Sequence, residues 1–432
     1  MARPKRLTGL PGWIAHRLFA NYWMLAVCAV IGAIPVALAI LWLDREGGTA
    51  WLLARDLATV ETSDTAKDFV GVAAGINATF ITLYFSITLI VLSMAAGNLG
   101  VRLIDRWVER RLVRVSIAGL SFSLILSLVA MLSIDAEAPL EETPLLLVGT
   151  VLFLQAVNVA MLAVSLHDLA RTMFVDTSID RLANDCEDRS LSLTGVAPSD
   201  GDLPFSCYAP REGYVEDVDT ARFCSAFSAS RKRVVVHVAP GQHVMKGERL
   251  ISSEVELDGH DIDRLIPIGA YRSDNQGVVF RIRLIVEIAA RALSPAINDF
   301  YTALTCADKL AAIIESQTST FIADYHAPAL EGEDWLILMG QDFHGLFADP
   351  LSAFRQAACQ YPSVSIRMID NYARIAERQP VDGSRTGLVA MLRQLAQDLS
   401  DHAVAVAEFD KDRHDIRKAF AKGFAKQAGT EG

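Results

Sequence analysis

The stretch from Phe69 to Ala96 most constrains what this chain can fold into, because it contains no charged residue. A helix needs about 20 predominantly apolar residues to cross a bilayer, and this stretch is longer than that. At a rise of about 1.5 Å per residue, the helix exceeds the ~30 Å hydrocarbon core and should tilt or protrude. A surface helix of a soluble protein would instead carry a charged face. The sequence therefore predicts an integral membrane protein.

The same stretch is unusually polar for a lipid-exposed helix, and its polar residues fall on two faces. At about 100° per residue, small and hydroxyl-bearing residues share one face: Gly75, Thr79, Thr82, Ser86 and Ser93. The opposite face carries Asn77, Tyr84 and Thr88. Small residues allow helices to approach closely, so packing against another helix is one interpretation. The lining of a water-filled path is the other.

Three further apolar runs bring the expected number of spans to four. They extend from Tyr22 to Leu43, where Pro35 predicts a kink, from about Val115 to Ile134, and from about Pro144 to Leu166. The N-terminal segment and the loop after the second span are rich in Lys and Arg, whereas the loop after the third span has neither. By the positive-inside rule, we expect the N- and C-termini in the cytoplasm, with the spans in the lipid bilayer.

Composition argues against several classes of function. The net charge of −11 and the lack of a basic stripe disfavour a nucleic-acid partner. The spans lack Asp, Glu, Lys and His, which ion-coupled carriers place within the membrane. Six cysteines without a CxxC pair predict free thiols, and we expect neither a metal nor a cofactor. No GxSxG, HExxH or Walker motif is present, so we do not expect an enzyme.

After the spans, the pattern predicts a cytoplasmic α+β domain in which a small β-rich module precedes helices. His167 marks the membrane exit of the fourth span, which we expect to continue as a stalk. Alternating residues around Pro240-Gly241 and Gly247 predict short strands joined by turns. The expected domains are a four-span transmembrane domain (1–168), a helical stalk (169–200), the β-rich module (201–270) and a helical cytoplasmic domain (271–432).

The motif RALSPAINDFYTA predicts a corner between two helices. Arg283, Glu287 and Arg291 are spaced four residues apart, as in a ladder of ion pairs. Ser294-Pro295 should end that helix, and Asn298 or Asp299 should cap the next one near Phe300. The corner is either a rigid helix–turn–helix connection or a binding pocket. Its candidate residues are Arg291, Ser294, Pro295, Asn298, Asp299 and Thr302.

Several motifs, in order, resemble a family of bacterial predicted membrane proteins, domain of unknown function two-two-five-four. They are FSITLIVLSMAA, GVRLIDRW, REGYV, PGQHVMKGERL and ALSP. Two positions depart from the family pattern: Phe300 replaces a proline, and RSDNQ follows the family's segment only loosely. The resemblance implies a multi-pass protein of the bacterial inner (plasma) membrane with a cytoplasmic domain, but it implies no specific activity.

Two hypotheses for function follow from these features. The first is a homo-oligomeric passive channel for an ion or small solute, with the cytoplasmic domain as vestibule or gate. It fits the uncharged spans and the polar second helix. The alternative is a membrane-anchored sensor or scaffold, whose cytoplasmic domain binds a small ligand or a partner protein.

Overall fold

The computed structural model describes residues 24–99, 111–172, 175–187, 191–198, 203–227, 230–257, 259–323, 325–380 and 385–425. These residues form two compact units. The first comprises the described residues as far as Gly97 together with 111–172, and the second comprises those from Val175 onward. The basic N-terminal segment and residues 101–110 of the second loop, on which the predicted orientation depends, lie outside the described residues.

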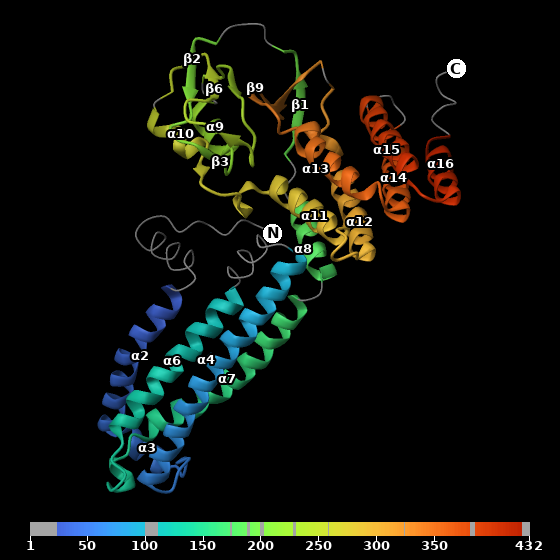
Figure 1. Ribbon diagram of the computed structural model, residues 1–432. Helices are drawn as coiled ribbons and strands as arrows, with labels where there is room; N and C mark the ends of the chain where they lie inside the picture. Colours follow the sequence, from blue (N-terminus) through green and yellow to red (C-terminus); the bar gives the residue numbers. More distant parts are fainter. Residues whose placement is uncertain are drawn as a thin grey trace. The chain divides into compact units, whose positions relative to one another are not determined.

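The first unit is a bundle of apolar helices (Figure 1). Four segments are long and apolar enough to cross a membrane, which confirms the predicted four-helix organisation: Met24–Leu53, Ser63–Met94, Leu112–Ser133 and Leu145–Arg171. Apolar residues from four helices meet in one core, among them Ala37, Val70, Leu126 and Val148. The elements are α2 (Met24–Leu43), η1 (Asp44–Gly48), α3 (Thr49–Leu53), α4 (Ser63–Leu99), α6 (Arg111–Ser133), η2 (Leu140–Glu142) and α7 (Leu145–Thr172).

A carboxylate connects the first helical segment to the N-terminus of α7. Asp44 is buried in the π-helical turn η1. Its oxygens accept hydrogen bonds from the backbone N–H groups of Leu146 at 2.9 Å and Leu147 at 3.1 Å. The Thr49 hydroxyl lies 2.9 Å from Asp44 Oδ1. The helical segment continues to Leu53, past Leu43, the expected end of the first span, and Asp44 has its partners inside the unit.

The second unit combines two sheets with helices, which confirms the predicted α+β class (Figure 1). The larger sheet has the strand order β1-β8-β9-β4-β6-β2, and the smaller sheet has the order β5-β3-β7. β4 and β9 pair in parallel, whereas the other pairs are antiparallel. The strands are β1 (Leu193–Val196), β2 (Phe205–Tyr208), β3 (Gly213–Val215), β4 (Val234–Val236), β5 (His243–Val244), β6 (Arg249–Ser253), β7 (Ile268–Gly269), β8 (Ala327–Leu330) and β9 (Glu333–Leu338).

Three strands of the larger sheet lie outside residues 201–270, the range in which alternation predicts strands. β1 precedes that range, and β8 and β9 form a hairpin well beyond it. β8 contains Pro328, and most of β9 is a continuous apolar run. Neither has the apolar–polar alternation of a half-buried strand, so the sequence pattern does not reveal them.

A buried arginine ties three segments of the second unit together. Arg281 is 2% exposed. Its Nε and Nη2 donate to the two carboxylate oxygens of Asp274 at 3.2 and 3.0 Å, and Nη1 donates to the Asp185 carbonyl oxygen at 3.0 Å.

The helices of the second unit are α8 (Val175–Glu187), α9 (Thr220–Phe227), α10 (Gly259–Leu265), α11 (Val278–Ala292), α12 (Phe300–Ser316), α13 (Phe343–Ala358), α14 (Pro362–Glu377), α15 (Thr386–Val406) and α16 (Asp410–Phe424), with 3₁₀ turns η3 (Asp274–Gln276) and η4 (Thr318–Thr320).

Candidate functional site

One polar face of α4 lies inside the bundle. Asn77, Tyr84 and Thr88 are 1%, 2% and 5% exposed. Asn158 of α7 donates from Nδ2 to Asn77 Oδ1 at 3.0 Å, although 81 residues separate the two. Amides that bond across helices in a membrane stabilise one arrangement of the bundle. This face of α4 therefore packs within the chain.

The polar contacts between helices continue along α7. Ser165 and Ser116 of α6 have their hydroxyl oxygens 2.6 Å apart, and both residues are buried. Gln155 lies one turn before Asn158, and its two amide atoms are buried without a hydrogen-bond partner among the described residues. Asn158 and Ser165 of α7 thus bond across helices.

The other polar face of α4 points away from the rest of the described unit. All five of its residues are exposed: Gly75, Thr79, Thr82, Ser86 and Ser93. The Thr79 hydroxyl donates to the Gly75 carbonyl at 2.8 Å, and the Thr82 hydroxyl donates to the Ala78 carbonyl at 3.0 Å. A Cβ atom placed on Gly75 would meet no atom within 4 Å. The described helices of the unit leave this face uncovered.

His167 is an exposed residue within α7. That helix continues to Thr172, and α8 begins at Val175. The sequence predicts that the fourth span continues past His167 as a helical stalk. Residues 173 and 174, between the two helices, lie outside the described residues. The structure shows that α8 packs on α12, where Lys309 forms an ion pair with Asp180.

The ALSP corner is a tight connection between α11 and α12. Of the two residues predicted as possible caps of α12, Asn298 and Asp299, it is Asp299 that caps the helix. Its carboxylate accepts from the Thr302 backbone N–H at 3.1 Å and from the Thr302 hydroxyl at 2.6 Å. Asn298 adopts φ +50°, and its N–H donates to the Ser294 carbonyl at 2.9 Å. Pro295 is exposed at the turn. The cap uses the Asp299 carboxylate, so this group supports the connection.

The ladder predicted on α11 is only partly formed. Arg291 Nη2 lies 3.7 Å from Glu287 Oε1. Arg283 Nη1 instead donates to the Gly241 carbonyl at 2.9 Å, which joins α11 to the PGQHVMKGERL turn. Burial lowers the pKa of the Arg283 guanidinium, and the nearby charge of Arg272 acts in the same direction. Two motifs that are distant in the sequence therefore meet through Arg283.

Replacing Asp299 by alanine should loosen the first turn of α12. Loss of an N-cap typically costs about 1 kcal/mol, equivalent to roughly fivefold faster amide exchange through local opening. Hydrogen exchange at the Thr302 amide of the full chain measures this directly. Asp299→Ser keeps an acceptor at the cap and should retain most of the protection. Equal exchange in D299A and wild type would contradict this role of the carboxylate.

Two structural residues were not among the candidates from sequence. Asp44 and Arg281 look like ordinary charged residues at the edge of a span and on an amphipathic helix. Their partners are backbone groups and a carboxylate that the fold brings together. For Arg281, the only local indication is an acidic residue seven positions earlier, Asp274.

All six cysteines lie within the described residues. All six cysteines are free thiols. Burial raises the pKa of the Cys306 thiol, with Asp176 and Asp299 acting in the same direction, so this thiol stays protonated. In the part of the chain that the structure describes, no three His, Cys, Asp or Glu side chains form a group able to hold a metal ion.

Comparison with known proteins places these features in a family. Residues 20–374 match the model of the DUF2254 family, described as predicted membrane proteins. The uncharacterized proteins Mb1321c of Mycobacterium bovis and Rv1290c of Mycobacterium tuberculosis are each 28% identical over 289 residues, covering 60% of this chain and 54% of theirs. The matched region thus spans about half the length of these relatives. No solved structure matches the chain. The chain belongs to the DUF2254 family of predicted membrane proteins.

Proposed function

We propose that the chain forms a homo-oligomer in the bacterial inner membrane that provides a passive pathway for an ion or small solute. The observation that carries this proposal is the uncovered polar face of α4. From Gly75 to Ser93 this face extends about 27 Å at 1.5 Å per residue, nearly the thickness of the hydrocarbon core. The polar residues recur at each turn from Gly75 to Ser86, and the exposed Leu89 and Ile90 separate them from Ser93. Hydroxyls repeated along a helix can line a path of this kind.

The two faces of α4 differ in how their polar groups are hydrogen-bonded, and this difference supports the proposal. The groups with the strongest hydrogen-bonding capacity, such as the Asn77 amide, are used within the bundle. Thr79 and Thr82 have hydroxyls already bonded to their own helix, and each oxygen retains acceptor capacity. Such groups offer weak, repeated contacts, which suit conduction better than tight binding. In this proposal both termini lie in the cytoplasm, and the second unit acts as vestibule or gate.

Substituting the stripe should block flux. The triple variant T79L/T82L/S86L would replace three hydroxyl groups by bulky apolar groups and create a hydrophobic constriction. We expect solute or ion flux into liposomes containing the purified full chain to fall at least tenfold. Single-channel recording, with and without membrane tension, should show loss or reshaping of discrete conductances.

Two further variants separate lining from packing. T79V/T82V/S86A removes the hydroxyls with little change in volume, and should lower conductance while the oligomer persists. Val157→Leu with Val164→Leu adds bulk at exposed positions of α7 and should leave flux unchanged. Normal conductance of T79V/T82V/S86A would mean that this face only packs chains together. A silent bilayer from folded wild-type protein would remove the channel proposal.

The second candidate function is a membrane-anchored sensor or scaffold. The observation that favours it is the size of the second unit, which has its own sheets, core and grooves. At the ALSP corner, however, Asp299 is already engaged as a helix cap. A ligand-binding role would therefore have to reside elsewhere in this unit.

A further inference from the structure

The second unit contains a groove rich in positive charge, which the transport proposal does not use. The groove lies among α12, α14, α15 and α16 and has a volume of about 1290 Å³. Five cationic side chains line it, against two carboxylates: Arg367, Arg374, Arg385, Arg393 and Lys422. This local excess occurs in a chain whose net charge is −11. Clefts lined by one sign of charge concentrate ligands of the opposite sign.

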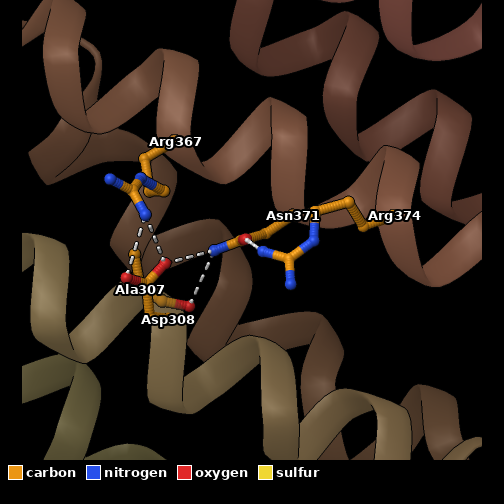
Figure 2. Close-up of polar contacts among 5 residues, drawn as sticks. All are labelled: Ala307, Asp308, Arg367, Asn371 and Arg374. Atoms are coloured by element: carbon orange, nitrogen blue, oxygen red, sulfur yellow. Dashed lines mark hydrogen bonds and ion pairs between the residues drawn. The ribbon is translucent and has the colours of Figure 1, made fainter.

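A buried amide holds one of these cations in place without neutralising it. Asn371 is buried, and its Oδ1 accepts a hydrogen bond from Arg374 Nη1 at 3.1 Å. Its Nδ2 donates to Asp308 Oδ1 at 3.0 Å and to the Ala307 carbonyl at 3.4 Å (Figure 2). The amide is thus fixed from the α12 side and presents its oxygen to the guanidinium. Among the described residues this bond uses one N–H donor of Arg374, which leaves four of its five donors for other partners.

Arg385 is held in the same manner, because its Nη1 donates to the Phe321 carbonyl at 3.2 Å. Arg367 differs, since its Nη1 lies 3.2 Å from an oxygen of Asp308 and its charge is balanced. Within the described residues, no ion pair is recorded for Arg374, Arg393 or Lys422. Neutral acceptors position two of the groove's cations while their positive charge stays available.

Close packing of α16 on α14 brings the last cation to the groove. A Cβ atom placed on Gly423 would lie 2.6 Å from Ala373 Cβ, so only glycine allows this approach. Lys422, which directly precedes Gly423, lines the groove from α16. Apolar side chains complete the lining, including Ile366 and Val389. The groove thus combines fixed cations with an apolar surface.

We propose that this groove binds an organic anion with two or more phosphate groups, of about the size of a nucleotide. Guanidinium groups match phosphate oxygens with paired, charge-assisted hydrogen bonds. Ligand sites of this kind typically occupy about 300–1,000 Å³, so the groove has sufficient room. The organic part of the ligand packs on Ile366 and Val389. One wall of the groove is formed by α15 and α16, which come after residue 374, where the family match ends. Family membership therefore does not supply this site.

The test measures binding to the full chain in phosphatidylcholine nanodiscs. Isothermal titration at low salt uses ATP and pyrophosphate as probes, with adenosine as the uncharged comparison. We expect micromolar binding of ATP that weakens as salt is raised, and none of adenosine. R374A/R393A/K422A should weaken ATP binding at least 100-fold, since each lost charged contact is worth about tenfold or more. Asn371→Leu, which removes the amide oxygen that positions Arg374, should weaken ATP binding about tenfold.

The matched control removes the same charge outside the groove. K411A/R417A/K418A changes three exposed cations of α16 that do not line it, and should bind ATP within twofold of wild type. A second titration uses cardiolipin vesicles, whose headgroup also carries two phosphates. Binding of cardiolipin alone, lost in R374A/R393A/K422A, would identify a lipid as the source of the phosphates. Equal losses in both triple variants, or no binding of any phosphate probe by folded protein, would overturn the proposal. Flux measurements are independent of this result.

Discussion

Replacing Arg281 by leucine should destabilise the second unit by roughly 3 kcal/mol. The guanidinium bonds both oxygens of Asp274 and the Asp185 carbonyl, and leucine can replace none of these contacts. Removal of one partner from a buried ion pair typically costs about 3–5 kcal/mol, and we take the low end because Asp274 is 31% exposed. Pulse proteolysis of the full chain in urea, followed on fragments of the second unit, measures the change.

The matched control is another paired arginine, Arg378→Leu. Its Nη1 lies 2.6 and 2.9 Å from the two Glu315 oxygens, but its side chain is 66% exposed. We expect a loss under about 1 kcal/mol there, because water screens the pair. R281L/D274L should recover part of the stability by removing the carboxylate as well. Similar losses for Arg281→Leu and Arg378→Leu would contradict the importance of burial at Arg281.

Replacing Asp44 by alanine should destabilise the first unit by on the order of 3 kcal/mol. The first backbone N–H groups of a helix have no partner within it, and Asp44 satisfies those of Leu146 and Leu147 at the start of α7. A carboxylate at that end also interacts favourably with the helix dipole. Thermal unfolding of the purified protein in detergent, read by loss of the monodisperse species, provides the measurement.

Asp44→Asn should give an intermediate loss, because one acceptor oxygen remains without the charge. Asp64→Ala is the control, since Asp64 is an exposed carboxylate in the first turn of α4. That change should cost under about 1 kcal/mol. If Asp44→Ala unfolds at the same temperature as Asp64→Ala, then Asp44 does not stabilise the start of α7.

Features that depend on local residue type were predictable from the sequence. The four apolar helices follow from long uncharged stretches, because bilayer thickness alone fixes their minimum length. A cap of α12 from Asn298 or Asp299 follows from short-range hydrogen bonding next to Ser294-Pro295, although the sequence did not decide between the two. Two opposed polar faces on α4 follow from helical periodicity. Periodicity left open which face is buried, because that depends on Asn158, far along the chain.

Features that depend on distant partners were not predictable. The spacing of Arg283 and Glu287 favours an ion pair, but the fold places the Gly241 carbonyl within reach of Arg283. β8 and β9 lack alternation because a proline and a buried apolar run are compatible with their places in the sheet. The cationic groove draws on four helices, and no local pattern distinguishes Arg374 or Arg393 from an ordinary surface arginine.

The position of β9 in the larger sheet has a consequence for synthesis of the protein on the ribosome. β9 lies between β8 and β4, and β1 pairs with β8. Until β8 has left the exit tunnel, β1 has no neighbour, and until β9 has followed it as far as Leu338, one edge of β4 is open. Exposed strand edges attract other chains, and distant pairing is slow to form. The nascent chain therefore carries an incomplete sheet, with exposed strand edges that favour aggregation, through the synthesis of α11 and α12.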